Sequence, residues 1–243
     1  MEKNFDPKKV LKHEKYISSQ LFNRHLFGGT REEYESGLFE FLELEATVSF
    51  DVSRFKTSKL HTPEEMASSP LALSFLIFLI RVCRPRIVLE IGSFIGYSTA
   101  NIAATLPADS RIYSYEKYEH FFEIAKENIE NLGVREQVVL RCGDAIKCLP
   151  KDLDEIGDVD FVFLDGNKEN YSKYLGLLGP KLKTGGLVVV DDCFFHGDLL
   201  NDPALTEKGA GIKQLFLDLA NNELWSSCVV PISNGMLLLM KQD

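Results

Sequence analysis

The chain has 243 residues, of which 45% are hydrophobic and 26% charged, and its formal net charge is -9 at pH 7. This composition is typical of a globular protein with a large core. The acidic balance argues against nucleic acid or an anionic membrane as a partner. The five cysteines are scattered and form no C-x-x-C pair, so neither a disulfide framework nor a zinc site is indicated. Together with the absence of an apolar leader at residues 1–6, these features predict a cytoplasmic protein without a membrane-spanning segment.

Two parts of the chain differ in pattern. Residues 1–60 are richer in charge and show no clear strand pattern, which predicts an N-terminal helical extension packed on a core domain of residues 61–243. Thr62 followed by Pro63, with Glu65 three residues after the threonine, is typical of a helix start. We expect this helix to run to about Cys83.

From residue 86 onward, short apolar runs alternate with helical periodicity. The expected strands are residues 87–91, 111–115, 138–140, 159–164 and 187–190, and the expected helices are 97–106, 122–132 and 171–182. Two further apolar runs surround Asn234-Gly235, which is typical of a hairpin. We therefore predict an α/β fold, a Rossmann-like, doubly wound, mostly parallel seven-stranded sheet with a C-terminal antiparallel hairpin strand and helices on both faces.

A ligand loop joins the first strand to its helix, from Glu90 to Ser98. The backbone at Gly92 and the helix N-terminus suit a bound ligand. A dinucleotide fingerprint would need glycine at the third and sixth positions counted from Gly92, but Phe94 and Tyr97 stand there, so a pyrophosphate ligand is disfavoured. The alternative is that the glycines only allow tight helix packing.

Acidic residues follow the next two strands at matching positions. Glu116 ends the second strand, where an acid can accept hydrogen bonds from ribose hydroxyls. Asp144 and Ala145 follow the third strand and would border an adenine ring. The pattern predicts a nucleoside-containing ligand.

Two apolar strands end abruptly in acid. Asp165 follows residues 159–164, and Asp191 and Asp192 follow residues 187–190. If these strands are neighbours, three carboxylates meet beside Lys168 at the carboxyl edge of the sheet. Carboxylates so close raise one another's pKa unless a cation neutralises them. The sequence thus predicts a metal site with a base next to it.

These motifs resemble those of a known family. Residues 89–98 are similar to the S-adenosylmethionine loop of class I methyltransferases, and residues 164–171 and 190–192 match two motifs of the cation-dependent O-methyltransferases, which include catechol and caffeoyl-CoA O-methyltransferases. The resemblance extends from about residue 66 to residue 241. It implies S-adenosylmethionine as the methyl donor, a bound divalent cation, and a homodimer.

The resemblance also implies roles for individual residues. It implies catalytic roles for Lys168, as general base, and Asp165; metal binding by Asp165, Asp191 and Asp192; and cofactor contacts from Met66, Ser68, Glu90, Gly92, Ser98, Glu116, Asp144, Ala145, Asp165 and Asn167. Hard oxygen ligands favour Mg²⁺, with Mn²⁺ and Ca²⁺ as alternatives.

Departures from the family pattern affect two positions. Asp192 stands where the family usually has Asn, which leaves the identity of the ion open. Asn167 stands where plant relatives often carry a second Asp, and we expect its role to survive by hydrogen bonding.

The substrate side is expected to follow the metal acids. Phe195 falls where relatives place an aromatic wall for the substrate ring, the alternative being that it packs on its own neighbours. His196 is a candidate second base or ligand, or simply a polar loop residue. Turn-forming residues predict a mobile loop over residues 198–211 that shapes the acceptor pocket.

The expected function is transfer of a methyl group from S-adenosylmethionine to a hydroxyl of a catechol-type small molecule. The nucleophile must be a phenolate, and a divalent cation touching a vicinal diol would stabilise that anion. Two alternatives remain open: a methyltransferase of the same fold that acts on an amine or a macromolecule, and a non-catalytic cofactor-binding regulator.

Overall fold

The computed structural model describes residues 48–220 and 222–243. The chain divides into two units, residues 1–45 and 46–243, and the described residues all belong to the second. The helical extension expected over residues 1–60 therefore lies mostly outside the described residues. Within the described ranges, no helix combines the length and the apolar character needed to cross a bilayer.

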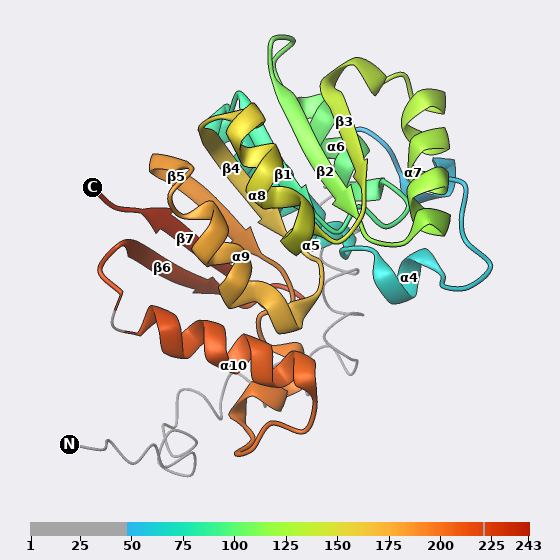
Figure 1. Cartoon of the computed structure of the whole chain (residues 1–243). Coiled ribbons are helices and arrows are strands. Elements are labelled where there is room, and N and C mark those ends of the chain that lie inside the picture. The colour runs from blue at the N-terminus through green and yellow to red at the C-terminus, as the bar shows by residue number, and fades with distance from the viewer. Residues whose placement is uncertain (1–47, 221) are drawn as a thin grey trace, which may run out of the picture. The chain divides into compact units, whose positions relative to one another are not determined.

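The second unit is built on one seven-stranded sheet with the order β3-β2-β1-β4-β5-β7-β6 (Figure 1). The strands are β1 (Ile87–Ile91), β2 (Arg111–Glu116), β3 (Val138–Cys142), β4 (Val159–Leu164), β5 (Leu182–Val190), β6 (Trp225–Val230) and β7 (Met236–Lys241). β1 to β5 pair in parallel, and β7 pairs antiparallel with both β5 and β6. The predicted fold class is confirmed.

Helices cover both faces of this sheet (Figure 1). On one face lie α5 (Pro70–Cys83), α6 (Tyr97–Thr105) and α7 (Glu119–Asn131), and on the other α8 (Ala145–Ile156), α9 (Tyr171–Leu178) and α10 (Glu207–Leu219). Short elements are α4 (Pro63–Met66) and the 3-10 turns η1 (Val52–Arg54), η2 (Arg135–Gln137), η3 (Lys168–Asn170) and η4 (Phe195–Leu200).

Alternation along the strands divides the core into two layers. In β4, Phe161 and Phe163 pack among the helices of the first face, while Val162 and Leu164 pack among those of the second. All four are fully buried. A strand buried on both faces reads as a continuous apolar run, which is why the sequence indicated β4 so clearly.

The helix expected over residues 62–83 is in fact two helices, α4 and α5. Pro70 has no N–H to donate and disfavours helical geometry at Ser69, which is extended with φ −59° and ψ 153°. The Ser69 hydroxyl then caps the new helix by accepting a hydrogen bond from the N–H of Ala72 at 3.2 Å. The chain therefore restarts its helix at Pro70.

The prediction of a mobile loop over residues 198–211 is wrong for residues 207–211, which belong to α10. Thr206 caps α10 by accepting a hydrogen bond from the N–H of Gly209 at 3.0 Å, so residues 209–211 are helical. The two glycines allow close packing instead of flexibility. A Cβ at Gly211 would lie 2.5 Å from the Lys168 carbonyl oxygen, and one at Gly209 would lie 2.0 Å from Asp198 Oδ2.

Two other elements differ from expectation. The helix expected over residues 171–182 ends at Leu178, because Pro180 cannot donate a further helical hydrogen bond, and β5 already begins at Leu182. Helix α8 was not expected at all, although its buried Ala145, Leu149 and Leu153 follow helical spacing. Pro150 lies inside α8 and weakens the sequence signal.

The segment before α4 is held against the core by two buried asparagines. Asn101 of α6 accepts from the N–H of Phe50 at 2.8 Å and donates to its carbonyl at 3.1 Å. Asn128 of α7 accepts from the N–H of Lys56 at 2.7 Å and donates to its carbonyl at 3.0 Å. These amides replace the ladder partners that a strand would provide.

Candidate active site

The parallel register brings the predicted acids together. Ile91 of β1, Leu164 of β4 and Val190 of β5 are aligned neighbours. The ladder continues one residue further, because the N–H of Asp165 donates to Ile91 O and the N–H of Asp191 donates to Leu164 O, both at 2.9 Å. The acids therefore leave the sheet at the same level of its carboxyl edge.

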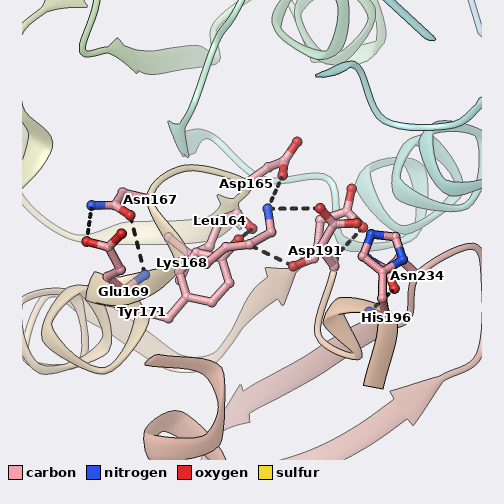
Figure 2. A network of polar contacts seen from close by, with 10 residues as sticks. Leu164, Asp165, Asn167, Lys168, Glu169, Tyr171, Asp191, His196 and Asn234 are labelled. Atoms are coloured by element: carbon pink, nitrogen blue, oxygen red, sulfur yellow. Dashed lines mark hydrogen bonds and ion pairs between the residues drawn. The ribbon is translucent and has the colours of Figure 1, made fainter. Parts of the chain in front are cut away.

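Lys168 lies between the two groups of acids (Figure 2). Its Nζ is 2.9 Å from Asp192 Oδ2 and 3.4 Å from Asp165 Oδ1. Lys168 begins η3, and only 8% of it is exposed. Asn167 caps this turn, since its side-chain oxygen accepts from the N–H of Glu169 at 3.4 Å. The lysine thus supplies the positive charge of the site.

Burial dominates the acidity of the two inner carboxyls. It raises the pKa of Asp165 well above its usual range, Lys168 lowers that pKa in part, and Asp191 and Asp192 raise it further. Burial, followed by repulsion from Asp192, raises the pKa of Asp191 to about 6. Both pKa values are therefore raised mainly by burial, and repulsion between the neighbouring carboxylates adds to that effect.

The pKa of Lys168 is raised, whereas a general base must be neutral and so needs a lowered pKa. Burial lowers the pKa of this ammonium, but the surrounding oxygen atoms of Tyr171, Asp165 and Asp192 outweigh burial and raise it above its usual value. In this arrangement Lys168 carries its proton. A base at this position needs the charge of the carboxylates to be taken up by another cation.

The three predicted metal ligands do not form a ready cation site. Within residues 48–220 and 222–243, no group of three or more His, Cys, Asp or Glu side chains is arranged to hold a metal ion. The Lys168 ammonium lies between Asp165 and Asp192 instead. The donor chemistry still fits a hard divalent cation, because the three predicted ligands are carboxylates.

Tyr171 joins the ends of the two acid-bearing strands. Its ring is fully buried, and its hydroxyl lies 3.4 Å from Leu164 O and 3.3 Å from Asp191 O, both hydrogen-bond acceptors (Figure 2). The structure adds a polar contact to each strand end.

Glu90 is the first residue of the ligand loop, residues 90–98, which is the proposed cofactor loop, and none of the surface of Glu90 is exposed. Its two carboxylate oxygens accept hydrogen bonds from the hydroxyls of Ser98, Thr99 and Ser114. A direct contact between Glu90 and a ligand is therefore not available in this arrangement. The carboxylate instead ties β1 to β2 and to the start of α6. Ser98, the other predicted cofactor residue of this group, is also buried, with 8% of it exposed.

The cofactor loop approaches both the acid site and the second strand. Gly92 has φ +103°, and a Cβ there would lie 2.5 Å from the Asp165 carbonyl oxygen. Glu116, at the end of β2, accepts hydrogen bonds from the N–H groups of Phe94 and Tyr118 at 2.8 and 2.9 Å. Burial raises the pKa of Glu116. Only glycine permits the close approach at position 92.

The remaining predicted cofactor residues lie at the ends of helices. Asp144 caps α8 through the N–H of Ile146, and its carboxylate is 3.5 Å from Lys117 Nζ; Ala145 is the first residue of that helix and is buried. Met66 ends α4 and is 48% exposed. The Ser68 hydroxyl, between α4 and α5, is buried, and its interaction with the Asp191 carboxyl lowers the pKa of that group.

The two predicted substrate residues lie in a strained segment. Asp192, Phe195 and His196 have φ of 55°, 39° and 53°, a left-handed region that costs non-glycine residues energy. Phe195 is half-buried and His196 is exposed, with their ring centroids 5.8 Å apart. The backbone N–H of His196 donates to the side chain of Asn234 at 2.9 Å.

Comparison with known proteins identifies the family. The sequence profile described as O-methyltransferase matches residues 46–242. The chain belongs to the O-methyltransferase family. The expectation from the ligand loop and the acid motifs, a class I S-adenosylmethionine-dependent enzyme of the catechol and caffeoyl-CoA O-methyltransferase group, is thereby confirmed.

Two relatives align with this O-methyltransferase over different parts of its length. A catechol O-methyltransferase of Niastella koreensis is 33% identical over 135 residues, which are 55% of this chain and 61% of that protein. The matched segment thus spans less than two thirds of that relative. Caffeoyl-CoA O-methyltransferase 2 of Petunia hybrida is 29% identical over 173 residues, 68% of this chain and 72% of that protein.

A solved structure supports the fold of the O-methyltransferase. The O-methyltransferase TomG of Streptomyces achromogenes, crystallised with S-adenosylmethionine, superposes with a TM-score of 0.79 at 26% identity and covers 88% of this chain and 100% of that one. S-adenosylmethionine as the cofactor is thereby supported.

Sequence reasoning missed several residues that contact the site. Ser93, Thr99 and Ser114 complete the hydroxyl network at Glu90. Asn234 was read only as a turn residue, although its side chain binds the segment after Asp192. Its partner lies 38 positions away, and no local spacing signals such a contact.

Proposed function

We propose that this O-methyltransferase transfers the methyl group of S-adenosylmethionine to one hydroxyl of a catechol-type small molecule, with the help of a divalent cation. Two relatives named catechol and caffeoyl-CoA O-methyltransferase support the acceptor class. The resemblance that suggested this acceptor also suggests a homodimer, which light scattering of the purified protein can test.

The site residues would hold the cation through carboxylates. Asp165, Asp191 and Asp192 are the proposed ligands, and a bound divalent cation would supply positive charge that stabilises a phenolate at neutral pH. The same charge would offset the carboxylates that now raise the pKa of Lys168. Lys168 Nζ is then the proposed acceptor of the hydroxyl proton.

Other residues of the chain would bind and orient the cofactor. The loop around Gly92 and the carboxylate of Glu116 line the proposed nucleoside site, and the Ser68 hydroxyl offers a hydrogen bond to a polar group of the cofactor. Because Gly92 lies against Asp165, the proposed cofactor loop and the acid site are adjacent. Such proximity aligns a methyl donor with its acceptor, which lowers the barrier by several kcal/mol.

One observation carries the proposal: three carboxylates and Lys168 gather at the carboxyl edge of the sheet, directly beside the proposed cofactor loop.

The first test measures release of S-adenosylhomocysteine with caffeic acid, caffeoyl-CoA, a simple catechol and a monophenol, each with Mg²⁺ and with EDTA. We expect turnover of the vicinal diols only, abolished by EDTA. Full activity in EDTA would refute the role of the cation. Preference for tRNA, protein or an amine over every diol would favour the alternative acceptor class.

Two lysine variants test whether Lys168 is the general base. Lys168→Ala should reduce kcat by about 10²–10⁴-fold, the usual contribution of a general base, with cofactor affinity unchanged in calorimetry. Lys173→Ala is the matched control, because this exposed lysine lies near the start of α9 and its Nζ bonds Asn170 rather than a site carboxylate. Equal activities of the two variants would remove Lys168 from the mechanism.

A further inference from the structure

We propose that Asn234 is a positioning residue that fixes the segment Cys193–Gly197, and with it the orientation in which the acceptor ring is presented for methyl transfer. The second part of this inference rests on the proposed function. Asn234 lies in the five-residue connection 231–235 between β6 and β7, outside the residues that the sequence motifs assign to the site.

The connection receives hydrogen bonds from three successive parts of the segment. The N–H of Cys193 donates to Gly235 O at 2.9 Å, and the N–H of Phe194 donates to Asn234 O at 2.8 Å. The N–H of His196 donates to Asn234 Oδ1 at 2.9 Å (Figure 2). Asn234 thus accepts two backbone donors directly after the Asp191–Asp192 pair, one with its main chain and one with its side chain.

The hairpin itself does not use the Asn234 side chain for closure. The connection closes through Gly235 N to Ile232 O at 2.7 Å and Ile232 N to Val230 O at 2.9 Å. Among its residues, positive φ values occur at Ser233 and Gly235, so Asn234-Gly235 is not the two-residue turn that such a pair usually forms. The side chain of Asn234 is therefore free to serve the neighbouring segment.

The segment needs external support because its backbone is strained. Phe195 and His196 both have left-handed φ values, which are unfavourable for non-glycine residues. Such conformations persist where surrounding contacts over-determine them. The hydrogen bond that the His196 N–H donates to the Asn234 side chain acts at the second of these two residues.

Packing also holds the connection 231–235 against the segment 193–197. Gly235 has φ +88°, and a Cβ there would lie 2.6 Å from the Phe194 ring, so this ring rests directly on the connection. The hydroxyls of Ser233 and Ser69 are in contact, which ties the connection to the start of α5. The connection therefore links the segment that carries Phe195 to the helix that follows Ser68.

The consequence for catalysis concerns orientation. Phe195 is the proposed wall for the acceptor ring, and its direction depends on the backbone that Asn234 holds. A catechol with one ring substituent offers two inequivalent hydroxyls, so the ratio of the two monomethylated products reports how the ring is presented. Loosening the segment should make this ratio less selective.

The experiment compares Asn234→Ala, Asn234→Asp and the matched control Asn222→Ala. The side chain of Asn222 also accepts a backbone hydrogen bond, from the N–H of Leu224 at 3.1 Å. Asn222, however, lies before the start of β6, at the end of that strand away from Asn234. Hydrogen–deuterium exchange of residues 193–196 is measured together with cofactor affinity, acceptor KM and the product ratio from 3,4-dihydroxybenzoate. The thermal midpoint of each variant shows that it is folded.

Asn234→Ala should speed amide exchange in residues 193–196 and raise acceptor KM by about 5–10-fold, as expected for one lost hydrogen bond. Its product ratio should move toward unity, while cofactor affinity changes less than about twofold. Asn234→Asp should restore exchange and ratio, since a carboxylate oxygen accepts the same N–H. The control should match the wild type.

Two results would overturn the inference. Exchange in Asn234→Ala that equals the control would show that Asn234 does not hold the segment. Faster exchange with an unchanged product ratio would show that the segment does not orient the acceptor. If the wild type methylates no diol, the proposed function fails, and the exchange measurement still decides whether Asn234 positions the segment.

Discussion

At the scale of single residues, the site is defined by carboxyl groups that are buried with too little positive charge. Asp191 is only 4% exposed and has Asp192 as its neighbour, while the ammonium of Lys168 contacts Asp165 and Asp192. Such an arrangement lowers the stability of the fold in return for reactivity. Stability measurements on the metal-free protein can therefore detect it.

Asp191→Asn should stabilise the EDTA-treated protein at neutral pH. The folded pKa of Asp191 is raised to about 6 by burial, so the folded state keeps a proton that the unfolded state loses near pH 4. Stability then falls as pH rises from about 4 to about 6 and stays lowered above that window. The variant lacks this loss and should gain on the order of 1–3 kcal/mol at pH 7, measured by urea unfolding.

Asp160→Asn is the control of opposite sign. Burial works against the charged form of Asp160, but Lys183 and the N–H groups of Ile87 and Arg86 lower its pKa overall. This variant should lose stability above about pH 4. A gain in both variants would show that the effect is not specific to the site.

Tyr171→Phe should lower both kcat and the free energy of unfolding. The lost hydroxyl lies against the carbonyls of Leu164 and Asp191, and its removal should cost about 1 kcal/mol. Because those carbonyls belong to the two acid-bearing strand ends, kcat should fall severalfold. Tyr174→Phe, a buried tyrosine of the same helix, is the control in a steady-state assay. Equal loss in both variants would contradict a role at the strand ends.

At the scale of elements, α10 is the part that most changes the interpretation of the sequence. Its glycines bring the helix onto the turn that carries Lys168 and onto Asp198, which accepts hydrogen bonds from the N–H groups of Leu205 and Thr206. The segment between η4 and α10 is therefore tied at both ends. Residues 207–211 are thus a packed helical turn, whereas residues 201–206 form a loop as the sequence predicted.

Gly211→Ala should destabilise the protein by about 1–3 kcal/mol, as overpacking does, and should reduce activity. The added methyl would meet the main chain of Lys168 and Glu169 at 2.5 Å, so the turn bearing the base must move. Gly176→Ala, on an open surface of α9, should instead stabilise by up to about 1 kcal/mol. In chemical unfolding, the free energy of unfolding should fall in Gly211→Ala and rise in Gly176→Ala. A rise in both variants would contradict the close packing at Gly211.

Strands and strand-end acids could be predicted from sequence because both signals are local. β4 is a continuous apolar run followed at once by Asp165, and this pattern needs no knowledge of distant residues. Helix α10 could not be predicted in the same way, because Gly209 and Gly211 resemble loop residues until their packing partners are known. The contact of Asn234 with His196 is equally invisible to spacing.

At the scale of the whole described unit, the carboxyl edge of the sheet gathers the chemistry, and two buried amides attach a further segment to the core. The asparagines Asn101 and Asn128 hold the segment before α4, in which Phe55 is buried in the core. Segment and core are thus joined by paired amide hydrogen bonds rather than by a strand.

Asn128→Ala should release the segment around Lys56. The substitution removes one acceptor and two donated hydrogen bonds, to Lys56 O and Ile95 O, and should cost about 1–3 kcal/mol. Limited proteolysis should then cut near residue 56 much faster than in the wild type. Asn131→Ala, exposed at the end of the same helix, should leave cleavage unchanged.

The place of β7 in the sheet order has a consequence for synthesis on the ribosome. β7 is made after β6 yet lies between β5 and β6. Until residues 236–241 have emerged, β5 is an unprotected edge and β6 has no strand to join, a state in which exposed strands invite aggregation. A nascent chain stalled before Met236 should therefore bind chaperones that the finished chain no longer needs.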